Sequence, residues 1–234
     1  MPRNFCGNFC GLLIGVLFEK LDVVEDRVPR DGAMNMAVDE VLLLSIQKPT
    51  LRFYGWKVPA VSFGYFGHVA DAKHFAAGRE IVRRWTGGGI VSHGKDLTYS
   101  LVIPASCEAF ARGSRVLYES IHAALSSSLN QQGFASALTP AESQKVSEAC
   151  FANPVTSDVM LGGVKIAGAA HRRTKRGLLH QGSVQIHLQS SFCDSFATAL
   201  AKTRITVELS AIDEAAAREI AGQKYATQAW NCRR

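Results

Sequence analysis

The sequence contains no hydrophobic run long enough to cross a membrane, no internal repeat and no low-complexity tract. Its longest apolar stretch, residues 9–18, is too short for a bilayer, which needs about 20 residues. Polar residues follow it in place of a small-residue cleavage site, so we interpret residues 1–20 as an N-terminal extension, with a secretion signal as the alternative. These absences exclude membrane-spanning, fibrous and disordered classes and predict a soluble globular protein.

Cysteine pairs and phosphate-binding motifs are also missing. None of the six cysteines belongs to a CxxC pair, and Cys6 and Cys10 have no second ligand pair nearby, so the sequence predicts neither a disulfide framework nor a metal site. This cysteine usage favours the reducing cytoplasm. The Walker and Rossmann glycine spacings do not occur. The 26 basic and 20 acidic side chains give a charge of +6 spread along the chain, which argues against nucleic-acid binding and fits an acidic protein partner.

Hydrophobic periodicity predicts one α/β domain over residues 21–234. Residues 115–130 repeat apolar side chains at helical spacing, and residues 158–161 and 164–167 flank Gly162-Gly163, a pair that favours a tight hairpin turn. Further strands are predicted at 51–54, 61–65, 81–85, 97–103 and 178–188, and further helices after Asp31, at 192–201 and after Ser210. Hairpins with few parallel crossovers indicate an α+β arrangement: a mixed, largely antiparallel sheet with flanking helices.

A glycine-rich run is the most concentrated candidate site. Arg83 and Arg84 precede three consecutive glycines, Gly87, Gly88 and Gly89. Glycines let a ligand approach backbone N–H groups closely, and arginines offer forked donors for a carboxylate or phosphate. The alternative is a glycine-rich turn beside a solvated arginine pair.

Lys165 is the second candidate, on the strand that follows the glycine pair. Strand alternation turns its side chain away from the face that bears Val164 and Ile166, and the small residues Gly168 and Ala169 keep the next stretch of backbone uncrowded. Lys165 could therefore point into a pocket. On this segment alone, an exposed strand lysine is the competing interpretation.

Cys150 is the third candidate. It lies in a loop, because Asn153-Pro154 disfavours a helix at Asn153, and it shortly precedes the predicted hairpin. A cysteine on such a loop could reach the same pocket as Lys165, and a cationic neighbour would favour the reactive thiolate. The alternative is a small buried cysteine, which is how we interpret Cys107 and Cys193.

These segments occur in an order that resembles the lipoate–protein ligase A / octanoyltransferase family of the biotin/lipoate A/B protein ligase superfamily. The matching runs are Asn-Met-Ala-Val-Asp-Glu at 35–40, Leu-Arg-Phe-Tyr-Gly-Trp at 51–56, Gly-Tyr-Phe at 64–66, the Arg-Arg and triple-glycine run ending at His93, Leu-Thr-Tyr-Ser at 97–100, Lys-Ile-Ala-Gly-Ala-Ala at 165–170 and a Lys-Tyr to Trp-Asn run at 224–231. The resemblance covers residues 21–231. It implies a fold like the catalytic domain of biotin–protein ligases and class II aminoacyl-tRNA synthetases.

The resemblance also implies roles for individual residues. It assigns Cys150 as the nucleophile and Lys165 as the group that contacts the acyl carbonyl. The residues that it places along the acyl pocket are Arg83, Arg84, Gly87, Gly88, Gly89, His93, Tyr99, Gly168 and Ala169. Where the family often has His-Asp, this chain has His93-Gly94, so the role of that aspartate is vacant or has moved to Asp96. Gln181-Gly182 stands in place of a more usual His-Gly.

Two chemistries remain open within this family. Cysteine-type octanoyltransferases take an octanoyl or lipoyl group from a carrier-protein thioester, such as that of acyl carrier protein, and pass it to a lysine of a lipoyl domain, with no metal or cofactor. ATP-dependent lipoate ligases use ATP and magnesium and generally need an accessory domain or protein. The position of Cys150 and the chain end at Arg234, which leaves no room for an accessory domain, favour the transferase.

The partners follow from the same resemblance. The expected acceptors are the lipoyl domains of 2-oxoacid dehydrogenase E2 or the glycine-cleavage H protein, with no nucleic acid or membrane involved. The basic turn at residues 172–176 is either a docking surface for acidic carriers or a solvated hairpin. A module that binds acidic lipoyl domains without catalysis is the alternative from another class. A biotin ligase is less well supported, because its Gly-Arg-Gly-Arg type run is missing.

Overall fold

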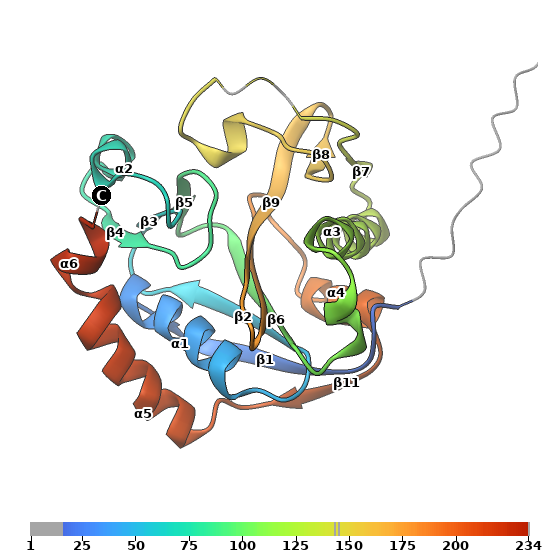
Figure 1. The fold of residues 1–234 in the computed structure, drawn as a ribbon. Coiled ribbons are helices and arrows are strands. Elements are labelled where there is room, and N and C mark those ends of the chain that lie inside the picture. The colour runs from blue at the N-terminus through green and yellow to red at the C-terminus, as the bar shows by residue number, and fades with distance from the viewer. Residues whose placement is uncertain (1–15, 143, 145, 234) are drawn as a thin grey trace, which may run out of the picture.

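Two sheets form the framework of the protein in a computed structural model that describes residues 16–142, 144 and 146–233 (Figure 1). The larger sheet has eight strands in the order β11 (Ala201–Val207), β1 (Phe18–Arg30), β2 (Thr50–Trp56), β6 (Leu97–Pro104), β10 (Gly177–Val184), β9 (Val164–Arg173), β8 (Val159–Leu161) and β7 (Ser136–Leu138). The smaller sheet has the order β4 (Glu80–Arg83), β3 (Ala60–Phe63) and β5 (Val91–His93).

The larger sheet is mixed. Strand β1 pairs in parallel with both β11 and β2, whereas β2, β6, β10, β9, β8 and β7 pair antiparallel in succession. The predicted fold class, a mixed and largely antiparallel sheet with flanking helices, is confirmed. Antiparallel pairing is what short hairpin connections require, and the β8–β9 hairpin turns at Gly162 and Gly163 with φ of 56° and 82°.

Helices cover both faces of the larger sheet. On one face, α3 (Ser114–Gln131) and α4 (Phe192–Leu200) share a core with alternate strand residues such as Leu101 and Leu178. On the other face, α1 (Gly32–Ser45) and α5 (Ala211–Ile220) pack over Val102 and Leu179, the neighbouring residues of the same strands. Neighbouring residues of each strand therefore point to opposite faces, as expected of a strand that is buried on both sides.

The remaining short helices lie near the smaller sheet and the end of the chain. Helix α2 (Val69–Ala76) packs on β3 and β4, a π-helical segment covers Ala221–Tyr225, and α6 (Gln228–Asn231) follows it (Figure 1). A 3₁₀ turn, η2 (Cys150–Ala152), lies in the loop between β7 and β8. No helix within the described part of the chain is long and apolar enough to cross a membrane.

Most sequence predictions of secondary structure agree with the observed elements. The predicted helix over 115–130 is α3, and Asp31 accepts the Met34 N–H as the N-cap of α1. The strand predicted over 178–188 ends earlier, at Val184, and β1, β5, β7 and β11 had no prediction. The expected domain boundary at residue 21 falls inside β1, which begins at Phe18, while residues 1–15 lie outside the described residues.

Candidate active site

Cys150 is held against the glycine-rich run by backbone pairing. Its N–H donates to the Ile90 carbonyl at 2.8 Å, and the Ile90 N–H donates to the Glu148 carbonyl at 2.9 Å. Gly89 makes this approach possible, because a Cβ there would lie 2.7 Å from the Glu148 oxygen. The Asn153 amide fixes the same loop by donating to the Ala149 carbonyl at 2.7 Å. The two segments singled out in the sequence, the glycine run and the cysteine loop, therefore lie side by side.

Lys165 is buried next to Cys150, and only 5% of it is exposed. Its Nζ lies 3.5 Å from Cys150 Sγ and donates to the Cys150 carbonyl at 3.1 Å. An ammonium group so close to sulfur stabilises the thiolate, which is the nucleophilic form of cysteine. The interpretation of Lys165 as an exposed strand lysine is therefore wrong.

A β-bulge in β9 directs Lys165 toward this site. Val159 pairs with Ala167, but the next residue, Met160, pairs with Lys165, so one residue of β9 is left over. Lys165 then packs across Gly168, where a Cβ would come within 2.4 Å of Lys165 Cε. Gly168 thus provides the space that the lysine side chain occupies.

Asp158 is the charged partner of Lys165, although the sequence pattern indicated only that it belongs to a strand. Its fully buried carboxylate lies 2.7 Å from Lys165 Nζ. The same carboxylate accepts the Tyr118 hydroxyl at 2.6 Å and the Val155 N–H at 2.7 Å. The only sequence signal was a lone carboxylate at the start of an otherwise apolar hairpin strand.

Arg84 holds the glycine-rich run in shape. Its guanidinium donates to the Gly87 carbonyl at 3.0 Å, to the Gly89 carbonyl at 2.8 Å and to Ser62 Oγ at 2.7 Å. Burial lowers the pKa of Arg84. Gly88 adopts a φ of 86°, which favours glycine.

Arg83 points away from the site. Its guanidinium donates to the Tyr65 carbonyl at 2.7 Å, the Gly67 carbonyl at 2.8 Å and the Trp230 and Asn231 carbonyls at 3.0 Å each. Successive residues on a strand face opposite sides, so only one of the two arginines can face the pocket. Arg83 connects β4 to the end of the chain and does not line the pocket.

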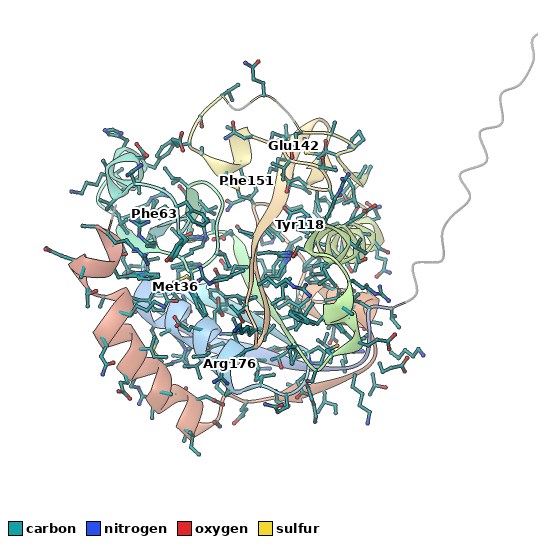
Figure 2. The ribbon with its side chains drawn as sticks, in the orientation of Figure 1. Met36, Phe63, Tyr118, Glu142, Phe151 and Arg176 are labelled. Atoms are coloured by element: carbon teal, nitrogen blue, oxygen red, sulfur yellow. The ribbon has the colours of Figure 1, made fainter. Side chains whose placement is uncertain are left out.

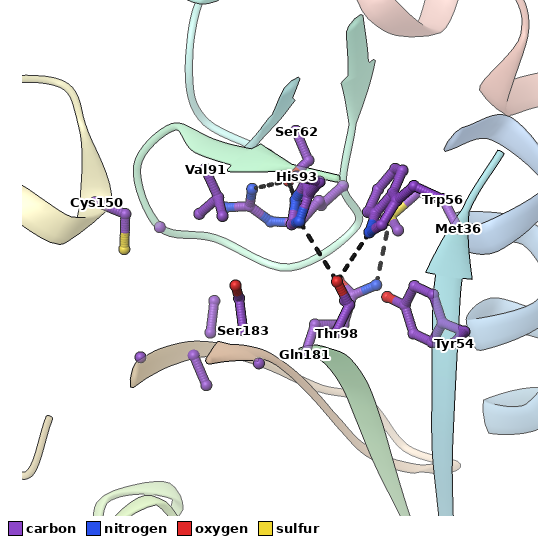
Figure 3. A pocket seen from close by; sticks show the side chains of 16 residues that line it. Met36, Tyr54, Trp56, Ser62, Val91, His93, Thr98, Cys150, Gln181 and Ser183 are labelled. Atoms are coloured by element: carbon purple, nitrogen blue, oxygen red, sulfur yellow. Dashed lines mark hydrogen bonds between the residues drawn. The ribbon is translucent and has the colours of Figure 1, made fainter. Parts of the chain in front are cut away.

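A narrow pocket lies beside Cys150 (Figure 3). It holds about 400 Å³ of empty space, counting its open part. In Figure 3 the Cys150 sulfur lies at one end of the view, and Met36, Tyr54 and Trp56 lie at the other. A thiol at one end and apolar or aromatic side chains at the other suit an elongated, largely apolar acyl group.

His93 forms part of the pocket wall. Its ring stacks on Trp56 at 4.1 Å between centroids, its Nδ1 lies 2.8 Å from Asp96 Oδ2, and its Nε2 lies 2.6 Å from Ser62 Oγ. Burial lowers the pKa of His93, although the hydrogen bond to Asp96 opposes this shift, so the ring is neutral at pH 7. Asp96, which the sequence analysis raised as a replacement for the missing aspartate, is therefore in contact with His93.

The floor of the pocket is a buried polar network. Gln181 donates to Asp39 Oδ2 at 2.7 Å and accepts the Thr86 hydroxyl at 2.7 Å. Asp39 in turn lies 2.8 Å from Arg52, whose side chain is fully buried. These polar groups hydrogen-bond to one another, which lowers the cost of burying them under an apolar ligand.

The other residues of the predicted site divide into two groups. Gly88, Gly168 and Ala169 line the pocket together with Arg84 and His93. Gly87 and Gly89 lie outside this lining, and so does Tyr99, which is fully buried with its hydroxyl 3.0 Å from His180 Nε2. The lining side chains that sequence reasoning missed are Met36, Tyr54, Trp56, Ser62, Val91, Thr98, Ala170, Gln181 and Ser183.

The basic turn after β9 lies far from this site. In Figure 2 Arg176 lies in the lower half of the view and Phe151, the neighbour of Cys150, lies in the upper half. The eight residue-to-residue steps of strand from Lys165 to Arg173 correspond to roughly 25 Å. The turn does not line the pocket.

Among residues 16–142, 144 and 146–233, no group of three or more His, Cys, Asp or Glu side chains could hold a metal ion. Cys6 and Cys10 lie outside the described residues.

Comparison with known sequences points to one enzyme family. The model of the lipoyl protein ligase A/B catalytic domain matches residues 31–221. The octanoyltransferase LipM of Oceanobacillus iheyensis is 36% identical over 173 residues, a match that covers 70% of this chain and 63% of that protein. The chain therefore spans less than two thirds of the length of this relative.

Two solved structures share the fold. Protein Ta0514 from T. acidophilum, with bound lipoic acid, is 24% identical, with a TM-score of 0.73 over 92% of this chain and 99% of that chain. A bi-partite lipoate protein ligase from Thermoplasma acidophilum, described with its E2 lipoyl domain, is 22% identical, with a TM-score of 0.65 over 92% and 96% of the two chains.

Proposed function

Because this chain belongs to the lipoyl protein ligase A/B catalytic domain family, we propose that it is an acyltransferase that moves an octanoyl group from a carrier-protein thioester to a lysine of a lipoyl domain. The observation that carries the proposal is the position of Cys150 Sγ, 3.5 Å from Lys165 Nζ and in the wall of a pocket that apolar and aromatic side chains also line. The relatives named octanoyltransferase LipM support the same reaction.

The first half-reaction loads Cys150. Its thiolate attacks the donor carbonyl, a bond forms between Sγ and the acyl carbon, and the bond between that carbon and the carrier sulfur breaks. The carrier thiolate leaves and takes up a proton from solvent. The octanoyl chain then occupies the pocket, with its far end against Met36, Tyr54 and Trp56.

The second half-reaction unloads Cys150. The neutral amine of the acceptor lysine attacks the Cys150 thioester, the new C–N bond forms, and the C–S bond breaks. The amine loses one proton to solvent, and Cys150 is restored as a thiolate paired with the Lys165 ammonium.

In the proposed reaction, two groups stabilise the tetrahedral oxyanion in both steps. Lys165 supplies an N–H bond and a positive charge. The Gly88 amide belongs to the pocket lining, and its N–H has no acceptor among the residues that the structure describes. Preorganised donors of this kind each contribute about 100-fold to 1,000-fold in rate.

The proposed reaction determines which cofactors, donor and acceptor the enzyme needs. A thioester donor is already activated, so the proposed reaction needs no ATP, metal or cofactor. The donor is acyl carrier protein or a lipoyl carrier, and the acceptor is a lipoyl domain of a 2-oxoacid dehydrogenase E2 or the glycine-cleavage H protein. A free thiol at Cys150 is maintained in the reducing cytoplasm.

Intact-mass analysis tests the proposal. Incubation with octanoyl acyl carrier protein should add one octanoyl group to the wild-type chain and to Cys193→Ala, a matched control whose cysteine packs against the core away from the pocket. Cys150→Ala should show no adduct. An adduct that persists in Cys150→Ala would refute Cys150 as the acyl carrier. If activity instead requires lipoate and ATP and releases pyrophosphate, the protein is a ligase.

A further inference from the structure

Every N–H bond of the Lys165 ammonium has an acceptor. Nζ lies 2.7 Å from Asp158 Oδ2, 3.1 Å from the Cys150 carbonyl oxygen and 3.5 Å from Cys150 Sγ. An ammonium group has three donors, so these contacts account for all of them. Two acceptors belong to the scaffold, and the third is the reacting sulfur.

We propose that Asp158 is a positioning residue for acyl transfer, which holds Lys165 so that one N–H bond alternates between Cys150 Sγ and the acyl oxygen. This inference rests on the proposed function. In the resting enzyme the bond points to the sulfur. Once Sγ carries the acyl group it is uncharged and a weak acceptor, so the same N–H turns to the neighbouring acyl oxygen. It returns to sulfur when the thiolate is released.

Tyr118 holds the Asp158 carboxylate, which in turn holds the Lys165 ammonium group. Its hydroxyl donates to Asp158 Oδ1 at 2.6 Å, while Oδ2 accepts the Val155 N–H at 2.7 Å as well as Lys165. Both carboxylate oxygens are therefore constrained. Burial, together with the Asp158 charge, raises the pKa of Tyr118 well above its usual value, so the hydroxyl keeps its proton and remains a donor.

The same hydroxyl connects this network to the pocket wall. Tyr118 accepts the Ala169 N–H at 3.2 Å, and Ala169 lines the pocket. The wall of the acyl pocket and the position of the ammonium are thus both set through one side chain. Lysine is a flexible side chain, and loss of Asp158 would allow Nζ to move. A displacement of about 1 Å at a reacting group can reduce a rate about 100-fold.

A double-mutant cycle distinguishes positioning from a general structural role. Single-turnover acylation by octanoyl acyl carrier protein is measured for wild type, Asp158→Asn, Lys165→Ala and the double variant. Asp158→Asn should lower the maximal rate about 100-fold and leave the donor KM unchanged, because Asp158 does not touch the substrate. In the Lys165→Ala background it should have no further effect, since Asp158 acts through Lys165.

Two results would overturn the inference: losses that multiply in the double variant, or a raised KM with an unchanged maximal rate. Tyr118→Phe keeps the ring and provides a second test if Asp158→Asn does not fold. Loss of one hydrogen bond to a charged group should slow acylation about 10-fold, and a wild-type rate would contradict the inference. Failure of the proposed function is separate, because wild type would then form no Cys150 adduct at all.

Discussion

Two buried ion pairs adjoin the pocket, and they differ in what their cations do. Arg52 is fully buried and binds Asp26 at 2.7 Å, Asp39 at 2.8 Å and the Asn35 side chain at 2.9 Å. Lys165 binds Asp158 at 2.7 Å and also lies 3.5 Å from Cys150 Sγ, the proposed nucleophile. The Arg52 guanidinium donates to side chains of the surrounding protein, whereas one N–H donor of Lys165 points to Cys150 Sγ. The comparison predicts that loss of either buried cation lowers stability, and that only loss of Lys165 also lowers the rate of acyl transfer.

Lys165→Ala should have the largest effect on rate. Removal of the ammonium eliminates both the charge that stabilises the thiolate and the oxyanion donor, so single-turnover octanoyl transfer should fall about 1,000-fold. The matched control is Lys202→Ala, whose side chain is 61% exposed and pairs with Glu19 at the surface. If Lys165→Ala transferred octanoate as fast as this control, the prediction that Lys165 determines the rate would be wrong.

Arg52→Ala should have the largest effect on stability. It leaves Asp39 and Asp26 without their buried cation, which typically costs about 3–5 kcal/mol. The free energy of unfolding in urea measures this loss. The control, Arg27→Ala, removes a side chain that is 85% exposed and should change stability by less than about 0.5 kcal/mol. Equal stability of the two variants would show that the Arg52 network is not structural.

Gly168→Ala perturbs the Lys165 pair without removing a charge. The new Cβ would lie 2.4 Å from Lys165 Cε, and the flexible side chain can move away while the backbone stays in place. We expect acylation to slow about 100-fold with little loss of stability. Gly222→Ala is the control, because its Cβ would meet nothing within 4 Å. Equal acylation rates for these two alanine variants would mean that the exact position of Nζ is unimportant.

The smallest expected effect concerns a buried group that is held neutral beside the Lys165 network. His122 contacts the Tyr118 ring, and burial lowers its pKa to about 4 from 6.5. Above pH 6.5 both folded and unfolded states are neutral, so His122 adds no pH dependence there. As the pH falls from 6.5 toward 4, only the unfolded state takes up the proton, and stability falls by up to about 1.4 kcal/mol per pH unit.

Urea unfolding between pH 7 and pH 4.5 measures this slope. His122→Asn should reduce it by about one proton, because the side chain no longer titrates. His68→Asn, which replaces an exposed histidine, is the matched control variant. An unchanged slope in His122→Asn would show that His122 is not held neutral by the fold.

The sequence predicted the two proposed reacting residues, Cys150 and Lys165, but not the groups that contact them. Motif order brought Cys150 and Lys165 to one site, and the glycine pair at 162–163 set the hairpin that carries the lysine. Asp158 was missed because a single carboxylate at the start of a strand has no local signature. The β-bulge that directs Lys165 toward Cys150 also has no local sequence signature, because it depends on the pairing between β8 and β9.

The lack of a local signature also explains why the sequence did not show which of Arg83 and Arg84 lines the pocket. Strand alternation requires Arg83 and Arg84 to face opposite sides, but periodicity cannot say which side holds the pocket. Strand β1 was missed because its charged residues interrupt any strict alternation, although Phe18, Leu21 and Val23 are buried. Long-range pairing with β2 and β11 determines that strand, and local pattern does not.

The most direct test of the account follows the acyl group from Cys150 to the acceptor. The octanoyl-enzyme is isolated after reaction with octanoyl acyl carrier protein and is then mixed with an apo lipoyl domain in the absence of ATP. The account predicts that mass equal to one octanoyl group leaves the enzyme and appears on a lysine of the lipoyl domain. An adduct that stays on Cys150, or a transfer that proceeds only when ATP is added, would contradict it.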